Sequence, residues 1–489
     1  MKYINYLVSG LALSMMVACS ESDELGENNA ASQGDAFMSL TIEMPNAGMN
    51  RTRAIDENGN KYEGTLGEQQ ISTLKLLVYK AADGSLEYEH QYAGTDLRPT
   101  APMPGTDKTT LYTLTPFKIT SGQKKVVVLV NAPENGKFDK TPALSLMRQP
   151  MTLTAQEVDA IASDNHFLMT NANKTANLNA NGSSKPNSEI SLPDGSYYQD
   201  GSVAVNVTGS KAAPTHVTIE VERAVAKIED KTADYTKSVT KREGDKVHFE
   251  KVALINGNTK FYPIKMIREQ GDLRNDYVVD PNFVKQTPAT VNDFYSRDFK
   301  TAFANRNDKG VIAKDLVKGK GAFFYTLENT MMKDEQMNGY TTGLYYQATY
   351  ELKDKTKGSN VYLYDGKLFD YQGLVEYAGK VLDLKGISDD ASQEVFENLG
   401  IKKYIGGRCY YAYWIRHINN NDATSMGAME FAVVRNNYYQ MEINSVKNIG
   451  DHRPVNPDPT TPDEIADSYL DVTVKVLPWI VRNLSLIHI

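Results

Sequence analysis

Hydrophobic and polar positions alternate over many short stretches of this chain, which is the pattern of strands with one buried face. Two of these stretches lie near opposite ends of the sequence. In "MSLTIEM" the apolar positions are Met38, Leu40, Ile42 and Met44. In "YLDVTVKV" they are Leu470, Val472, Val474 and Val476. Each stretch is predicted to be a strand, and the two strands share one pattern.

Further strands are predicted between these ends. "ISTLKLLVYKAADGSLEYEHQY" alternates on both sides of Asp83 and Gly84, a dipeptide that favours a tight hairpin. "KKVVVLV" is almost continuously apolar, as expected of a strand buried on both faces. Alternation returns in "THVTIEVERAVAKIED", "TGLYYQATYEL", "CYYAYWIRH" and "MEFAVVRNNYYQMEINSV".

Two helices are predicted. "TAQEVDAIA" begins with Thr154 and has Glu157 three residues later, so that the two side chains can cap one helix end. A second helix is expected over residues 390–399 and is ended by Gly400. Many short strands with two helices predict a mainly β fold of two β-sandwich domains, with the boundary near Arg223.

Composition supports a folded protein. The 489 residues suffice for two domains, and 41% hydrophobic with 23% charged residues is the balance of a soluble globular chain. The net charge of −8, without a basic stripe, argues against a nucleic-acid partner.

The first residues read as an export signal. Lys2 precedes the apolar run "YLVSGLALSMMVA", which is too short to span a membrane as a mature helix. "MVAC" resembles a bacterial lipobox, in which Cys19 becomes the lipidated N-terminus. The alternative is a plain signal peptide with an incidental cysteine. The acidic "SESDELGENN" that follows resembles the tag of lipoproteins sent to the outer face of the outer membrane. With Cys19 lipidated, Cys409 is the only thiol expected in the mature chain, so no intramolecular disulfide is possible.

The strand at residues 470–476 follows a proline-rich segment, "RPVNPDPTTPDEIAD". This segment is predicted to be an extended, stiff arm that could reach on the order of 40 Å. The strand at residues 38–44 leads into a loop with Arg51 and Arg53. We hypothesise that proteolysis at these arginines removes the first strand and that the last strand of a neighbouring copy replaces it. Taken alone, the two arginines also fit a solvated basic loop.

Catalytic motifs are absent from the sequence. It contains no HExxH, CxxC, G-x-S-x-G or phosphate-binding loop, so an enzyme is not expected. Cys409 lies in a predicted strand and reads as a buried structural thiol. "NNND" at residues 419–422 could offer oxygen ligands to calcium, but a plain turn fits better because acidic residues are few. Neither a metal ion nor a cofactor is predicted.

Several segments resemble, in their order, those of the fimbrillins, the lipoprotein precursors of type V pili in Bacteroides-type bacteria. The segments are "VACS" at 17–20, "NRTRA" at 50–54, "ISTLKLLVYKAADGSLE" at 71–87, "VVVLVNAPE" at 126–134, "HFLMTNA" at 166–172, "ERAVAKIE" at 222–229, "YTLENT" at 325–330 and "GAMEFAVVRNNYYQMEINSV" at 427–446. The resemblance is nearest to the stalk subunit of the minor fimbriae.

The resemblance implies two transthyretin-like β-sandwich domains and attachment of lipid, such as palmitate, at Cys19. It also implies cleavage between Arg53 and Ala54, or after Arg51, by an arginine-specific extracellular protease. The expected parts are a signal peptide (1–19), a propeptide (20–53), N-terminal (54–222) and C-terminal (223–454) domains, and an arm with donor strand (455–489).

Polymerisation by donor-strand exchange would carry the protein from the outer membrane into a surface fimbrium for adhesion and biofilm formation. The implied partners are other copies of the chain, anchor and tip fimbrial proteins, the protease and surface receptors. The alternative is a monomeric surface lipoprotein that binds glycans through Trp414 or a tyrosine of "YYAYW". One departure from the family is the ending "IVRNLSLIHI", where a second alternating piece of donor strand is expected.

Overall fold

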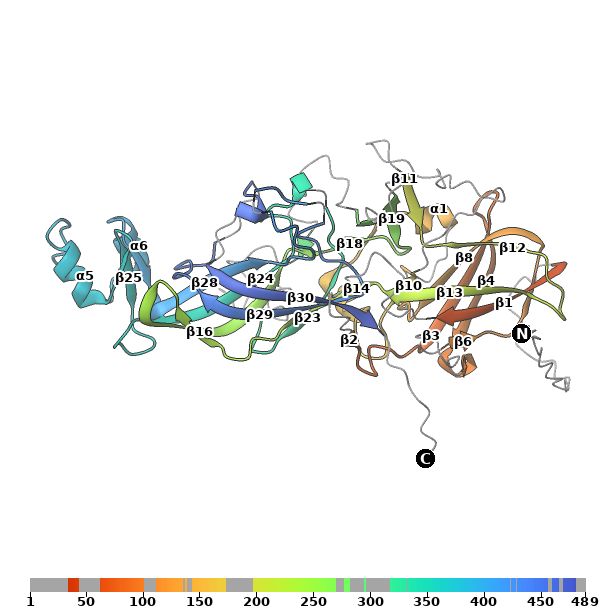
Figure 1. The fold of residues 1–489 in the computed structure, drawn as a ribbon, viewed down its shortest axis with the longest axis horizontal. Coiled ribbons are helices and arrows are strands. Elements are labelled where there is room, and N and C mark those ends of the chain that lie inside the picture. The colour runs from red at the N-terminus through yellow and green to blue at the C-terminus, as the bar shows by residue number, and fades with distance from the viewer. Residues whose placement is uncertain are drawn as a thin grey trace, which may run out of the picture.

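The structure is a computed structural model of the chain. It describes residues 34–43, 62–100, 111–134, 137–138, 143–172, 197–269, 277–281, 294–295, 317–331, 333–422, 424–427, 429–455, 460–465 and 469–480. Most regular structure is strand, so the predicted mainly β class is confirmed. Figure 1 shows two strand-rich bodies that follow one another along the longest axis of the molecule.

The first body is built on a ten-stranded sheet, here called the N-terminal sheet. Its strands, in spatial order, are β4 (Leu86–Ala93), β3 (Thr73–Lys80), β8 (Gly122–Val130), β10 (Met169–Asn171), β13 (Thr215–Arg223), β1 (Ala36–Glu43), β6 (Leu111–Thr113) and β5 (Arg98–Thr100). Two more strands pair beside this path, β12 (Val203–Val207) with β8 and β7 (Phe117–Ile119) with β1.

The second body is built on another ten-stranded sheet, here called the C-terminal sheet. Its order is β2 (Tyr62–Glu63), β30 (Leu470–Ile480), β29 (Asn437–Val446), β15 (Thr236–Val239), β16 (Arg242–Ile255), β24 (Gly343–Glu351) and β28 (Arg408–Trp414). Beside this path lie β14 (Val225–Asp230), β22 (Val317–Lys318) and β23 (Phe323–Leu327).

Smaller sheets and helices decorate both bodies. The small sheets are β11 (Tyr197–Asp200) with β19 (Met266–Glu269) and β20 (Tyr277–Val279), β17 (Gly257–Asn258) with β21 (Phe294–Tyr295), β18 (Lys260–Phe261) with β9 (Met151–Thr152), and β25 (Val361–Tyr364) with β26 (Lys367–Phe369) and β27 (Lys402–Tyr404). The helices are α1 (Leu144–Met147), α2 (Ala155–Ala160), α5 (Tyr371–Ala378) and α6 (Gln393–Glu397), with 3-10 turns η1 (Gly94–Asp96), η3 (Lys333–Glu335), η4 (Ile405–Gly407) and η5 (Asp463–Ile465). Among the described residues, no helix is long and apolar enough to cross a membrane.

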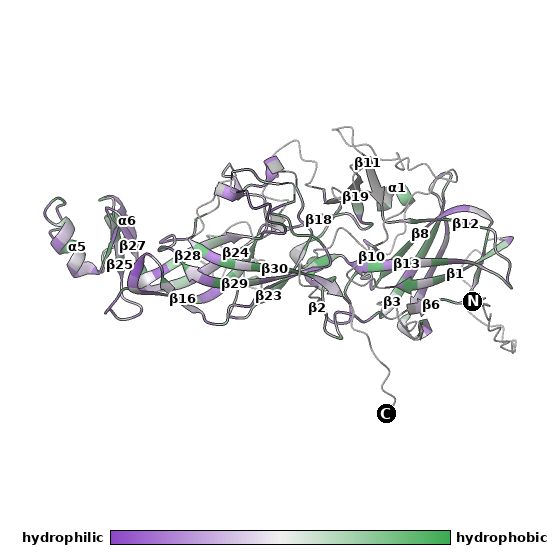
Figure 2. Cartoon of the chain, in the orientation of Figure 1, coloured by the Kyte–Doolittle hydropathy of each residue, from purple (hydrophilic) through white to green (hydrophobic). Residues whose placement is uncertain are grey.

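Each large sheet has its own hydrophobic core. The N-terminal core includes Leu40, Leu76 and Val128, and the C-terminal core includes Tyr346 and Met441. Figure 2 shows hydrophobic residues along the strands of both bodies. Burying a large apolar side chain contributes about 1.5 to 3 kcal/mol, so these cores are the main source of stability.

Local signals were predicted correctly. The Asp83–Gly84 turn joins β3 to β4, with Gly84 at a φ of 69° that suits glycine. Residues 124–130 of β8 are buried throughout. The Thr154 side chain accepts a hydrogen bond from the Glu157 backbone, and the reciprocal bond completes the predicted capping box of α2.

The prediction of two helices was incomplete. The expected helix at 390–399 is present as α6, but α1 and α5 were missed. The signal for α5 was available, since the Asp370 side chain accepts from the Gly373 backbone and Leu374 and Ala378 are buried four residues apart. Helix α5 belongs to a small outlying module with β25, β26, β27 and α6 (Figure 1).

Candidate functional site

Strand β1 holds an inner position in the N-terminal sheet. One edge pairs in parallel with β13 from Met38↔Thr215 to Glu43↔Glu220, and the other edge pairs antiparallel with β6 and β7. Figure 1 shows β1 beside β13 in the N-terminal body. The strand therefore lies inside the sheet and is not an edge strand.

Both faces of β1 are shielded from solvent. Met38, Leu40 and Ile42 have no exposed surface and pack in the N-terminal core. On the other face, Ser39 and Thr41 are also buried. The Ser39 hydroxyl lies 3.0 Å from His216 Nδ1, and the Thr41 hydroxyl lies 3.1 Å from His216 Nε2. Burial of the three large apolar side chains stabilises the sheet by on the order of 5 to 9 kcal/mol. Loss of β1 would leave an apolar groove next to β13.

The other predicted residues of this region, Met44, Arg51, Arg53, Ala54 and Cys19, lie outside the described residues.

Strand β30 lies close to the edge of the C-terminal sheet. It pairs antiparallel with β29 from Val446↔Leu470 to Asn437↔Pro478. Within the described residues, strand pairing on its outer side is limited to the two residues of β2, which face Trp479 and Ile480. The last strand is thus bound to its own chain, and among the described residues most of its outer edge has no strand partner.

The predicted alternation of β30 is present. Leu470 is buried, and Val472, Val474 and Val476 are half-buried against the C-terminal core. Asp471, Thr473 and Lys475 are exposed on the opposite face. These three side chains keep one face of this part of β30 in contact with solvent.

The buried face of β30 changes at its end, which sequence reasoning missed. Leu477 and Trp479 lie on the face that carries exposed residues earlier in the strand, yet both pack in the N-terminal core. The Arg223 guanidinium lies 4.3 Å from the centre of the Trp479 ring, and its Nη1 donates to the Trp479 carbonyl at 3.0 Å. Phe167 meets the same ring edge-on at 5.6 Å. The end of β30 is therefore fixed between the two large sheets.

A buried ion pair supports this junction. Lys227 Nζ lies 2.7 Å from Glu68 Oε1, and Tyr325 donates its hydroxyl to the same oxygen at 2.6 Å. Lys227 also donates to the hydroxyl of Tyr62 in β2 at 2.8 Å. Burial opposes ionisation of Glu68, but the hydrogen bonds from Lys227 and Tyr325 outweigh it and hold the pKa of Glu68 below its usual value.

Acidification is expected to test this pair. Because the pKa of Glu68 is lower in the folded state, its contribution is present above the unfolded pKa of about 4.5 and is lost as pH falls below that value. Glu68→Gln should therefore lower the urea midpoint at pH 7 and show a smaller further loss at pH 3.5 than the parent chain. Glu376→Gln, on the exposed side of α5, is the matched control. An equal acid response of Glu68→Gln and parent would contradict the assignment.

The proline-rich arm differs from its prediction. Residues 460–465 do not extend freely, because Pro462 bridges to Met337 and η5 forms within the arm. Glu464 of η5 lies 2.8 Å from Arg416, which also pairs with the buried Glu430. A proline-rich sequence sets the backbone preference, but it does not show whether the segment finds a surface to pack against.

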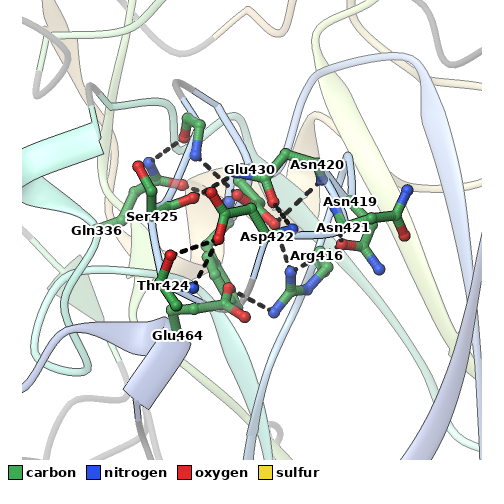
Figure 3. Close-up of polar contacts among 12 residues, drawn as sticks. Gln336, Arg416, Asn419, Asn420, Asn421, Asp422, Thr424, Ser425, Glu430 and Glu464 are labelled. Carbon is green, nitrogen blue, oxygen red and sulfur yellow. Dashed lines mark hydrogen bonds and ion pairs between the residues drawn. The ribbon is translucent and has the colours of Figure 1, made fainter.

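The loop at residues 419–422 has a bend at Asn421 and is held by hydrogen bonds from backbone amides to Asn side chains. Figure 3 shows its polar groups turned toward one another beside Arg416. Asp422 accepts from the Thr424 backbone at 2.9 Å, and Asn420 Oδ1 accepts from the Asp422 backbone at 2.7 Å. Over the described part of the chain, no group of three or more His, Cys, Asp and Glu side chains is placed to hold a metal ion.

The aromatic residues proposed for glycan binding are mostly buried. Tyr410, Tyr411 and Trp414 are between 3% and 7% exposed. A sugar-binding platform needs an accessible ring face, so these rings serve the core. Cys409 has no exposed surface, and burial raises the pKa of its thiol to about 12, in agreement with the predicted structural role.

Comparison with known families decides the identity of the chain. The family described as "Major fimbrial subunit protein (FimA)" matches residues 36–223, and the family described as "Major fimbrial subunit protein type IV, Fimbrillin, C-terminal" matches residues 402–484. Together the two matches span more than half of the sequence. The chain belongs to the fimbrillin family of fimbrial subunit proteins. The resemblance seen in the sequence is thus confirmed, and this fimbrillin is a structural subunit of a cell-surface fimbrium and not an enzyme.

Solved structures similar to this fimbrillin include fimbrial proteins. The fimbrilin FimA from Porphyromonas gingivalis is 17% identical, with a TM-score of 0.44 over 92% of this chain and 99% of that one. The tip fimbrial protein Mfa3 with a C-terminal truncation, from the same organism, is 11% identical, with a TM-score of 0.36 over 91% and 100%. A fimbrial assembly protein from Parabacteroides distasonis is 12% identical, with a TM-score of 0.34 over 84% and 93%. No curated protein matches the sequence.

Proposed function

We propose that this fimbrillin is the stalk subunit of a fimbrium and polymerises by protease-triggered exchange of its terminal strands. The observation that carries the proposal is the inner position of β1, whose three large side chains are fully buried. Removal of such a strand leaves a groove that must be refilled. A strand with the same alternation, β30, is present in every copy of the chain.

The route to the fibre follows from the two ends. The precursor is exported, lipidated at Cys19 and held at the outer membrane by this lipid. An arginine-specific extracellular protease cuts between Arg53 and Ala54, or after Arg51, and releases β1 with residues 20–53. The domains at 54–222 and 223–454 remain, with the arm and donor strand at 455–489.

Assembly then joins copies head to tail. The strand at residues 470–476, with Leu470, Val472, Val474 and Val476, leaves its own C-terminal sheet and enters the groove of the next copy. Because donor and groove are different surfaces of one chain, the contact does not close on itself and builds a filament. Anchor and tip fimbrial proteins complete the fibre, which serves adhesion to surface receptors and biofilm formation.

Release of β30 requires specific contacts to break. Arg416 must part from Glu464, Pro462 from Met337, and Trp479 from Arg223. The backbone hydrogen bonds that β30 loses when it leaves β29 are replaced by backbone hydrogen bonds to β13 of the neighbouring copy. The exchange therefore substitutes one set of strand contacts for another, and its direction depends on how well the donor fits the empty groove.

Controlled proteolysis tests the proposal. Precursor residues 20–489 are incubated with an arginine-specific protease and followed by intact mass and by laddering in SDS without boiling. The expected result is loss of residues 20–53 followed by a ladder. A precursor lacking residues 468–489 is the matched control and should be cut without forming a ladder. Fibres from this control, or no cleavage at Arg51 or Arg53 in the parent, would overturn the proposal.

A further inference from the structure

The two terminal strands match residue by residue, beyond their shared alternation. Residues 36–44 read "AFMSLTIEM" and residues 468–476 read "SYLDVTVKV". When the two sequences are aligned, both have a small residue at the first position and an aromatic residue at the second. Both have apolar residues at positions three, five, seven and nine. Threonine occupies the sixth position in both. The charge of the side chain changes at two positions only, the fourth and the eighth.

The surroundings of β1 give the match a physical meaning. Ala36 is 2% exposed, so its position has no room for a much larger side chain. Moving the donor forward by two residues would place Leu470 at this position. Moving it back by two would place Ser468 in the fully apolar site of Met38. Only the unshifted alignment gives each core site a side chain of suitable size and polarity.

The two charge changes face suitable partners on β13. Ser39 lies across from His216, whose Nδ1 is 3.0 Å from its hydroxyl, and Asp471 would replace it with a carboxylate that can accept from the imidazole. Glu43 lies across from Glu220, and Lys475 would replace a like-charged neighbour with an opposite one. Opposite charges stabilise a cross-strand pair and like charges destabilise it.

We propose that residues 468–476 enter a second copy of this chain in the register of residues 36–44, parallel to β13. Thr473 then lies beside Thr218, Asp471 beside His216 and Lys475 beside Glu220. The two new charge pairs favour the incoming donor over the strand that it replaces, and they make the groove selective for copies of this chain. The inference rests on the proposed strand exchange and specifies its partner surface.

Engineered disulfides can read the register directly. Adjacent strands lie about 4.8 Å apart, within the range that a disulfide can bridge. Thr218 and Thr473 are both exposed in the structure and tolerate replacement by cysteine. Cys409 is buried, so its thiol is not expected to form a disulfide with the engineered cysteines. The double variant Thr218→Cys/Thr473→Cys is made as the whole precursor, cut with the arginine-specific protease, oxidised, and then boiled in SDS without reductant.

The expected result is a covalent ladder that collapses to monomer when reductant is added. The controls Thr218→Cys/Asp471→Cys and Thr218→Cys/Lys475→Cys report a shift of two residues in either direction. Each removes one charged residue of the donor, so its covalent ladder is compared with the amount of unboiled fibre that the same variant forms, and this ratio should be at least several-fold lower than for the predicted pair. A covalent ladder in a control and not in the predicted pair would overturn the register while leaving strand exchange intact. Unboiled fibres without a covalent ladder in any of the three variants would also overturn it. Absence of unboiled fibres in the parent chain would overturn strand exchange itself.

Discussion

Leu40→Ala is expected to lower the free energy of unfolding of the uncleaved chain by about 2 to 5 kcal/mol. Leu40 has no exposed surface and packs in the N-terminal core, so the smaller side chain leaves a cavity. Under the proposed function, the same substitution leaves assembled fibres unchanged, because cleavage after Arg53 removes residue 40. Urea unfolding of the precursor and heating of the fibres in SDS measure the two effects.

Leu76→Ala is the matched control for this prediction. Leu76 is equally buried in the same core, but its strand, β3, stays in the processed chain. Its substitution should weaken precursor and fibre alike. Fibres that lose as much heat resistance from Leu40→Ala as from Leu76→Ala would show that β1 persists in the mature subunit.

Arg435→Met is expected to destabilise the chain by about 3 to 5 kcal/mol. Arg435 and Glu328 form a two-pronged ion pair, and both side chains are fully buried. Burial raises the pKa of Glu328, and the charge of Arg435 works against that rise. Without the guanidinium, Glu328 is still buried and still feels the negative charge of Glu222. The free energy needed to bury its carboxyl group is then no longer offset by the ion pair. Urea unfolding at pH 7 measures the loss.

Two further variants make this prediction specific. The double variant Arg435→Met/Glu328→Leu should lose less stability than Arg435→Met alone, because it removes both charges of this buried pair together. Arg453→Met should have little effect, since the Arg453 side chain is 53% exposed and its pair with Glu397 lies in solvent. A double variant as unstable as the single one would mean that packing, and not the unpaired charge, sets the loss.

Local features of the fold could be predicted from the sequence because short-range contacts determine them. The hairpin at Asp83 and Gly84 needs only a turn sequence between two alternating stretches. The start of α2 needs only Thr154 and Glu157, whose side chains reach each other's backbone. The family could also be named from several short segments that follow one another in the family's order, and the matches at residues 36–223 and 402–484 confirm it.

Long-range features could not be predicted in this way. The inner position of β1 depends on β13, and their paired residues Thr41 and Thr218 are far apart in sequence. An alternating pattern states that one face is buried, but it does not name the strands on either edge. For the same reason, the contact of Glu464 with Arg416 could not be read from a proline-rich segment.

The sequence by itself determined the alternation of both terminal strands, the cap of α2, the hairpin of β3 and β4, and membership of the fimbrillin family. Only the tertiary structure decided that β30 buries Val474 against one core and Trp479 against the other. The physical reason is that hydrophobic burial has no direction of its own. A strand that runs from one core to the other buries a different face in each core. The sequence shows which residues are apolar, but it does not show which core each of them packs against.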